Sequence, residues 1–239
     1  MDAITQYCPV AVGTEILADR WTPLILREFI CGAHTFGEIQ NGIPTISRSL
    51  LSARLRQLVG NGILERREEQ PGKPKYWLTP AGADLQDFVF ALGDWAIRWA
   101  YFHDPRDEQL DNTHLMWRVG RGVLRDRVPN RRVVTEFVLT CPTGVTERIW
   151  LVIEPDDVDT CVKHPGFDVD LEVRTSSREL HRIWLGRTTI PDAIQAGTLE
   201  IEGPPALARA FPRWFSFSPF ARKVQRAMKG GDAPARMAS

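Results

Sequence analysis

The stretch TISRSLLSARLR, residues 45–56, decides how the first half of this chain folds. Leucines at positions 51, 55 and 58 recur at helical spacing, which predicts an amphipathic helix over residues 46–59 with one buried face. The opposite face then presents guanidinium and hydroxyl groups to solvent. Residues 41–63 contain no Asp or Glu, so no carboxylate on that face would repel phosphate. Such a helix has the chemistry needed to enter the major groove of duplex DNA.

The elements on either side place this helix in a recognisable order. Apolar residues at helical spacing predict helices over residues 10–17 and 22–30, and a short helix follows over residues 35–39. After the turn at Asn61-Gly62, residues 63–67 and 76–78 are predicted to form a hairpin, and Thr79-Pro80 begins a long helix. The order helix, helix, short helix, turn, helix, hairpin, long helix predicts a winged helix-turn-helix.

The exposed face of the predicted recognition helix and the hairpin tip supply the candidate DNA contacts. Arg reads guanine through two hydrogen bonds, and Ser or Thr binds phosphate or a base edge. An ordinary solvated helix is the alternative, and the basic hairpin that follows directly argues against it. In that hairpin Glu65, Glu68 and Glu69 can pair with Arg66 and Arg67, so the lysines near the tip are favoured. The predicted contacts are Thr45, Ser47, Arg48, Ser49, Ser52, Arg56, Lys73 and Lys75.

Over about residues 8–99 the sequence resembles the HxlR family of winged-helix regulators, which is related in fold to MarR proteins. It departs from the family at Leu17-Ala18-Asp19-Arg20, where glycines and a lysine are more common. The resemblance implies a transcriptional regulator that binds a palindromic operator as a homodimer. The segments that carry it are Cys8–Val10, Ile16–Leu17, Arg20–Trp21, Leu24–Leu26, Thr35–Ile39, Ile43–Ser47, Leu51, Arg54–Leu58, Asn61–Arg66 and Tyr76–Gly82.

The resemblance also implies that the first helix and the long helix after the wing form the dimer interface. The long helix carries an apolar stripe that is too extensive for an exposed single helix. Packing of this stripe against the protein's own second domain is the alternative. The predicted interface residues are Leu85, Phe88, Leu92, Trp95 and Trp99.

A cysteine at the position of Cys8 senses oxidants or electrophiles in several members of the family, and the resemblance implies that role for Cys8. No cation lies near it in the sequence to lower the pKa of its thiol, and inert packing is the alternative. A thiol-based regulator whose second domain is only structural is therefore an alternative function.

The polar segment PRDEQLDNT, residues 105–113, separates two unlike halves. We predict a DNA-binding and dimerisation domain over residues 1–103, a linker over 104–113, a second domain over 114–228 and a disordered tail over 229–239. Short β-branched and aromatic runs between helical patterns predict an α+β fold for the second domain.

Residues 182–187 and 190–204 resemble the end of sterol-carrier-protein-like domains, which enclose an apolar tunnel for lipids or other hydrophobic molecules. The resemblance implies a hydrophobic small-molecule effector that modulates DNA affinity. Core packing is the alternative role for each aromatic candidate. The candidates for ligand binding are Trp117, Phe137, Trp150, Trp184, Phe211 and Trp214.

Composition limits the other classes of function. The formal net charge is zero, so DNA binding must rest on a local basic surface. No apolar run approaches the roughly 20 residues of a membrane span and no signal peptide is recognisable, so we expect a cytoplasmic protein without a membrane partner. The four cysteines have no zinc spacing, and no catalytic or phosphate-binding motif occurs. We therefore expect no metal, no cofactor and no enzymatic activity, with a lipid-carrying or enzymatic module fused to the DNA-binding domain as a second alternative.

Overall fold

The computed structural model describes residues 7–101 and 103–229, and the chain divides into two compact units, Met1–Gly93 and Asp94–Ser239. Of the predicted disordered tail, residues 230–239 lie outside the described residues, and Lys229 is the last residue of a helix. Each unit builds its own hydrophobic core, so each can be understood by itself.

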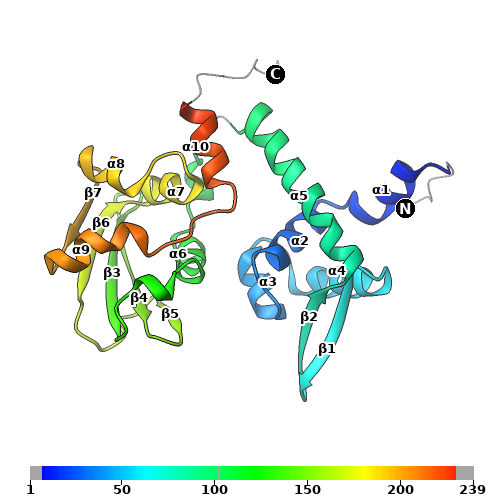
Figure 1. Ribbon diagram of the computed structural model, residues 1–239, viewed down its shortest axis with the longest axis horizontal. Coiled ribbons are helices and arrows are strands. Elements are labelled where there is room, and N and C mark those ends of the chain that lie inside the picture. The colour runs from blue at the N-terminus through cyan, green and yellow to red at the C-terminus, as the bar shows by residue number, and fades with distance from the viewer. Residues whose placement is uncertain (1–6, 102, 230–239) are drawn as a thin grey trace. The chain divides into compact units, whose positions relative to one another are not determined.

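The first unit has the element order of a winged helix-turn-helix, which confirms the fold predicted for this half (Figure 1). Its core consists of the apolar faces of its helices, and Ile25, Leu26, Leu51 and Leu55 are fully buried there. In chain order the elements are α1 (Pro9–Leu17), α2 (Thr22–Ile30), α3 (Phe36–Gly42), α4 (Arg48–Gly60), β1 (Leu64–Gln70), β2 (Lys73–Leu78) and the start of α5 (Pro80–Trp99).

Local sequence signals set the helix ends in this unit. Thr35 and Glu38 form a reciprocal capping box at the start of α3: the Thr35 hydroxyl accepts from the Glu38 N–H, and the Glu38 carboxylate accepts from the Thr35 N–H. The Ser47 hydroxyl caps α4 by accepting from the Leu50 N–H at 3.3 Å. After α4 the chain turns at Gly62, whose φ of 70° favours glycine.

The β1–β2 hairpin is the wing of the winged helix, and its strands are longer than the sequence pattern predicted. The hairpin pairs Leu64 with Leu78 at its base and Gln70 with Lys73 at its tip. Pro71-Gly72 makes a two-residue turn, and Gly72 has a φ of 74°. Because this turn is tight, pairing continues through the charged residues that the pattern assigned to a loop.

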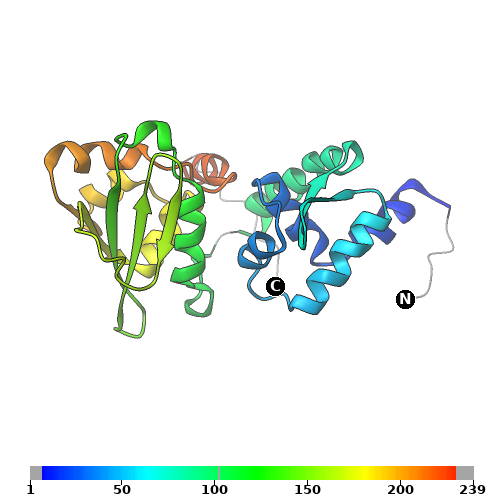
Figure 2. The same cartoon turned by 90° about the horizontal axis from the view of Figure 1, so that it is seen from below.

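The second unit is an α+β fold, as expected. It contains a mixed sheet in the order β5-β4-β3-β6-β7, in which β3 and β6 are parallel and the other neighbours are antiparallel (Figures 1 and 2). Its elements are η1 (Asp107–Gln109), α6 (Asn112–Arg121), η2 (Arg125–Arg127), β3 (Val133–Thr140), β4 (Thr146–Ile153), β5 (Val158–Cys161), β6 (Leu171–Ser176), α7 (Ser177–Leu185), α8 (Ile190–Gln195), β7 (Leu199–Glu202), α9 (Pro205–Ala210), η3 (Phe211–Arg213) and α10 (Ala221–Lys229).

One face of this sheet packs against helices to form the main core of the second unit. Alternate residues of the strands, such as Phe137 and Leu151, meet the apolar sides of α6 and α7 and the buried rings of Phe211 and Trp214. The other face carries a smaller cluster around Val134 and Trp150. Because β3 is covered on both faces, its residues are buried from Val133 to Leu139.

Candidate nucleic-acid interface

The α4 helix presents the predicted recognition face to solvent. Its leucines at positions 51, 55 and 58 are buried, which turns the opposite side of the helix outward. Arg48, Ser49 and Arg56 are exposed there, and Ser52 is half-buried. Thr45 and Ser47, just before the helix, are also exposed. The structure therefore leaves all of these predicted contacts at least partly exposed, on α4 or in the turn directly before it.

A buried glutamate fixes the turn that precedes α4. The Glu28 carboxylate accepts from the Arg27 guanidinium, and Arg27 also donates to the Gly42 carbonyl at 3.2 Å. A Cβ at Gly42 would lie 2.1 Å from the Glu28 carboxylate oxygen, so a side chain there would force these groups apart. Gln40 donates to the Ile46 carbonyl at 2.7 Å and holds the same turn. These contacts position α4 relative to α2 and α3.

The three arginines of α4 have different surroundings. Arg54 forms an ion pair with Asp19 and donates to Gln57, so it is engaged with the protein. Arg48 lies over the ring of Phe36, with 5.1 Å to the ring centroid. Within residues 7–101 and 103–229, neither Arg48 nor Arg56 forms an ion pair. Arg48 and Arg56 are thus the cations of this helix that remain for phosphate or base contacts.

The arginines of the wing are neutralised by neighbouring acids. Arg66 lies 3.9 Å from Glu68, and Arg67 pairs with Glu65. Arg67 also lies over the ring of Trp77, with 5.5 Å to the centroid. These pairs agree with the expectation that the wing glutamates engage the wing arginines.

The two lysines near the tip of the wing are not equivalent. Lys75 Nζ is 2.6 Å from the Glu69 carboxylate, a cross-strand pair that the sequence analysis missed. Lys73 is exposed at the start of β2 and forms no ion pair in the part of the chain that the structure describes. Of the two predicted contacts, Lys73 has the freer charge.

The loop between α2 and α3 braces the base of the wing. Thr35 makes a β-bridge with Lys75, and the Tyr76 N–H donates to the His34 carbonyl at 2.7 Å. The His34 ring stacks on Trp77 with 3.8 Å between ring centroids. This brace connects the wing to the start of α3.

The apolar stripe of α5 is only partly covered. Phe88, Leu92 and Trp95 remain 42%, 45% and 50% exposed, whereas Leu85 and Trp99 are half-buried. Exposure of large apolar groups at positions i, i+4 and i+7 forms one continuous band on a helix. This band is the surface predicted to form the dimer interface.

Cys8 occupies the N-cap position of α1, directly before Pro9. The backbone N–H groups of Ala11 and Val10 lower the pKa of the Cys8 thiol below its ordinary value, because they stabilise the thiolate. This cause lies in the backbone and not in a nearby cation, so the side chains around Cys8 in the sequence do not show it. In the sequence, the Cys8-Pro9 pair directly before a helical pattern is the signal that could have predicted the N-cap position of Cys8.

The six aromatic residues considered for ligand binding do not form one site. Phe137, Trp184 and Phe211 line a small cavity of about 10 Å³, roughly the space of one water molecule. The other three lie elsewhere: Trp214 is buried in the same core, Trp150 lies on the opposite face of the sheet, and Trp117 is half-buried on α6.

Among the described helices, none has the length and apolar character needed to cross a bilayer. Within the same described residues, no three His, Cys, Asp or Glu side chains gather where they would bind a metal ion.

The similarity of this chain to known proteins lies in the winged helix and α5. Residues 16–104 match the model of the family described as HxlR-like helix-turn-helix. The HTH-type transcriptional regulator YvaP of Bacillus subtilis (strain 168) is 32% identical over 98 residues, which are 40% of this chain and 91% of that protein. YodB, an HTH-type transcriptional regulator of the same organism, is 39% identical over 42% of this chain and 89% of its own length. The solved structure of reduced YodB is 34% identical over 40% of this chain and 97% of its own, with a TM-score of 0.36.

Proposed function

This chain belongs to the family of HxlR-like helix-turn-helix transcriptional regulators, and we propose that it binds a palindromic operator as a homodimer through α4 and the β1–β2 wing. The observation that carries the proposal is the exposed face of α4, where Arg48 and Arg56 form no ion pair with any residue that the structure describes. A chain of zero net charge binds DNA only where cations face the duplex unpaired.

Dimerisation is supported by the exposed apolar band of α5. A two-fold axis would repeat the Phe88, Leu92 and Trp95 band on both copies, and each would cover the other's exposed rings. The two α4 helices would then reach successive major grooves, about 34 Å apart on one face of the duplex. We place this function in the cytoplasm, where a bacterial-type regulator meets its DNA.

Binding of the purified full chain to labelled DNA from upstream of its own gene tests the proposal, with a shuffled duplex of equal length as the control. We expect binding to the upstream DNA to be about 10³-fold or more tighter than to the shuffled duplex at physiological salt. Equal affinity for both duplexes would contradict sequence-specific binding through α4.

For regulation, we propose that a hydrophobic effector binds in the second unit, between the sheet and α7. The supporting observations are the resemblance to sterol-carrier-protein-like domains and a cavity lined by Phe137, Leu180, Ile183 and other apolar side chains. Since the cavity holds only about 10 Å³, an effector would bind only as α7 moves outward. A ligand that prefers the opened form shifts DNA affinity by linkage. Titration with the neutral dye N-phenyl-1-naphthylamine tests this, and an absence of fluorescence enhancement would contradict it.

Thiol sensing is the alternative mode of regulation, and the position of Cys8 at a helix N-cap supports it. In that case the second unit would only stabilise the protein. A Cys8→Ser protein that keeps its response to an oxidant would exclude this mode. Turnover of a bound hydrophobic molecule would favour the second alternative, a lipid-carrying or enzymatic module; we assign no enzymatic activity.

A further inference from the structure

We propose that Arg20, in the turn between α1 and α2, binds the phosphate backbone of the operator beside α4, and that Asp19 holds it in position for this contact. Arg20 lies outside the interface of α4 and the β1–β2 wing proposed above, and outside the contacts predicted from the sequence. The inference rests on the proposed function, since it takes α4 to be the helix that enters the major groove. All the residues that carry it belong to the first unit.

Asp19 fixes both ends of the turn that carries Arg20. One of its carboxylate oxygens, Oδ2, lies 2.5 Å from the Arg54 guanidinium in the middle of α4. The other, Oδ1, accepts from the Trp21 N–H at 2.9 Å, and the Asp19 carbonyl accepts from the Thr22 N–H at 3.1 Å. The turn is therefore tied to α4 on one side and to the start of α2 on the other. Because Arg54 already neutralises Asp19, this carboxylate does little to repel a phosphate beside Arg20.

The Arg20 side chain is exposed, and an aromatic ring positions its guanidinium. The guanidinium lies over the ring of Trp21, with 4.5 Å to the ring centroid. Trp21 is only 8% exposed and belongs to the core of the first unit, so core packing fixes the ring beneath the charge. Stacking uses the flat face of a guanidinium and leaves the N–H groups at its edge for hydrogen bonds. Among the described residues Arg20 forms no ion pair, so these donors remain for a phosphate.

Arg48 has the same arrangement on the other side of α4. Its guanidinium lies over the Phe36 ring, with 5.1 Å to the centroid. Positions 48 and 54 stand six residues apart, so their side chains point about 120° apart around the helix axis, with a buried leucine midway between them. Arg48 therefore lies on one flank of the helix, and the Asp19–Arg54 pair places Arg20 beside the opposite flank.

The two flanks of a recognition helix face different parts of the DNA. The major groove of B-DNA is about 12 Å wide and admits one α-helix, with a phosphate backbone along each rim. A helix that enters the groove with its exposed face toward the bases turns one flank to each rim. Arg20 then meets the backbone on the side away from Arg48. Phosphate contacts fix the register of a protein on the duplex and carry no sequence information, so Arg20 should contribute equally to the affinity for any duplex.

The salt dependence of binding measures this contact. Fluorescence anisotropy of the full chain with the operator and with a shuffled duplex, over a range of salt concentrations, gives the slope of log K against log salt. Arg20→Gln removes the charge from an exposed position. We expect the magnitude of the slope to fall by about 0.9 for each Arg20 on a phosphate, hence by about 1.8 for the proposed dimer, with both duplexes. The same relation gives an affinity loss of about 30-fold at about 0.15 M salt. Arg20→Lys keeps the charge and should keep most of the slope.

Two comparisons separate the contact from other effects of the substitution. Arg209→Gln, at an exposed arginine of α9 in the second unit, changes the net charge by the same amount and should leave the slope unchanged. Asp19→Asn removes the ion pair with Arg54 and keeps an acceptor for the N–H that follows Arg20. In the Asp19→Asn background, the further loss from Arg20→Gln should shrink to about fivefold or less, because Arg20 is no longer held beside α4. Urea unfolding shows that each variant is folded.

An unchanged slope in a folded Arg20→Gln protein overturns the contact, and so does an equal fall in the Arg209→Gln protein. A loss confined to the operator duplex would place Arg20 on a base edge and overturn the assignment to phosphate. Equal losses from Arg20→Gln in the wild-type and Asp19→Asn backgrounds overturn the positioning role of Asp19. A wild-type protein that binds neither duplex defeats the proposed function itself, whereas wild-type binding that Arg20→Gln leaves intact defeats only this inference.

Discussion

Asp19, in the loop between α1 and α2, forms a 2.5 Å ion pair with Arg54 of α4. The same carboxylate caps the loop by accepting from the Trp21 N–H at 2.9 Å, and Arg54 also donates to Gln57. The pair therefore ties the loop before α2 to α4, the helix proposed to contact DNA. It also distinguishes Arg54, which forms an ion pair, from Arg48 and Arg56, which form none among the described residues.

A double-mutant cycle on Asp19→Asn and Arg54→Gln measures this tie. Both side chains are about three-quarters buried, so we expect a coupling of about 1 kcal/mol in the free energy of unfolding, at the upper end for exposed pairs. Urea unfolding at low and high salt is the measurement, and the coupling should shrink as salt screens it. A coupling near zero at low salt would show that the pair contributes nothing to stability.

Removing Arg48 or Arg56 should weaken operator binding by about 1–3 kcal/mol each if they read bases. Because neither forms an ion pair among the described residues, stability should change by less than about 0.5 kcal/mol. Fluorescence anisotropy with operator and shuffled duplexes separates base reading from phosphate contact. Arg54→Ala is the matched control on the same helix, and it should leave sequence preference intact. Wild-type operator affinity in an Arg48→Ala/Arg56→Ala protein would falsify this placement of the interface.

The wing lysines should differ in their effect on salt dependence. Lys73→Ala should weaken specific and non-specific binding alike and lower the slope of log K against log salt by about 0.9 if it contacts one phosphate. Lys75→Ala should have a smaller effect, because Glu69 already neutralises this lysine. Glu69→Gln frees Lys75 and should strengthen non-specific binding. If Lys73→Ala and Lys75→Ala lower the slope of log K against log salt equally, the Glu69–Lys75 ion pair does not persist when the protein is bound to DNA.

The winged helix was readable from the sequence because its signals are local. Helical periodicity, the Thr35 and Ser47 caps and the Asn61-Gly62 turn each act within a few residues. The wing strands were predicted too short because Lys73, Pro74 and the wing glutamates are residue types with low β-strand propensity. Pairing across the tight turn overrides these weak local preferences.

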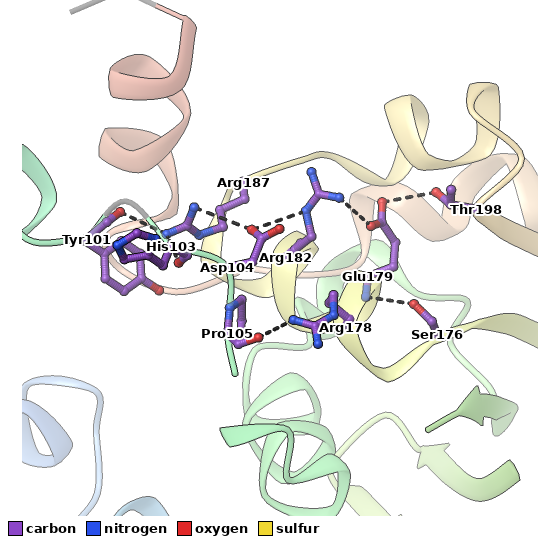
Figure 3. Close-up of polar contacts among 10 residues, drawn as sticks. All are labelled: Tyr101, His103, Asp104, Pro105, Ser176, Arg178, Glu179, Arg182, Arg187 and Thr198. Atoms are coloured by element: carbon purple, nitrogen blue, oxygen red, sulfur yellow. Dashed lines mark hydrogen bonds and ion pairs between the residues drawn. The ribbon is translucent and has the colours of Figure 1, made fainter. Parts of the chain in front are cut away.

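Contacts between residues distant in the sequence could not be predicted from the sequence alone. Glu69 meets Lys75 only in one register of the hairpin, so the pairing depends on where the turn forms. The contacts of Arg187 with Tyr101, His103 and Asp104 span more than eighty positions (Figure 3), and they depend on how α7 lies on the sheet. Residue type alone also could not show that Trp150 faces away from Phe137, although alternation along each strand is a strict rule once the register is known.

A charge placed in the α5 band should disrupt the dimer. Leu92→Glu or Trp95→Glu puts a carboxylate where the proposed interface would bury an apolar side chain, and an unpaired buried charge is strongly unfavourable. Sedimentation equilibrium should then give a monomer and operator affinity should fall. Gln86→Glu adds a charge to the opposite side of α5 and should leave both unchanged. A Leu92→Glu/Trp95→Glu protein that remains a dimer would place the interface elsewhere.

Iodoacetamide should alkylate Cys8 faster than Cys161 near neutral pH. The N–H groups of Val10 and Ala11 lower the pKa of Cys8, whereas burial and then the nearby Asp159 carboxylate raise the pKa of Cys161. A lower pKa means a larger thiolate fraction at any pH below the ordinary range, and the thiolate is the reactive form. Iodoacetamide labelling followed by mass spectrometry from about pH 6 to about pH 11 covers both midpoints, and the Cys8 midpoint should be the lower. Thr14→Val, inside α1, leaves the N-cap residue in place and serves as the control. Equal midpoints for the two thiols would remove the physical basis for preferring Cys8 as a sensor.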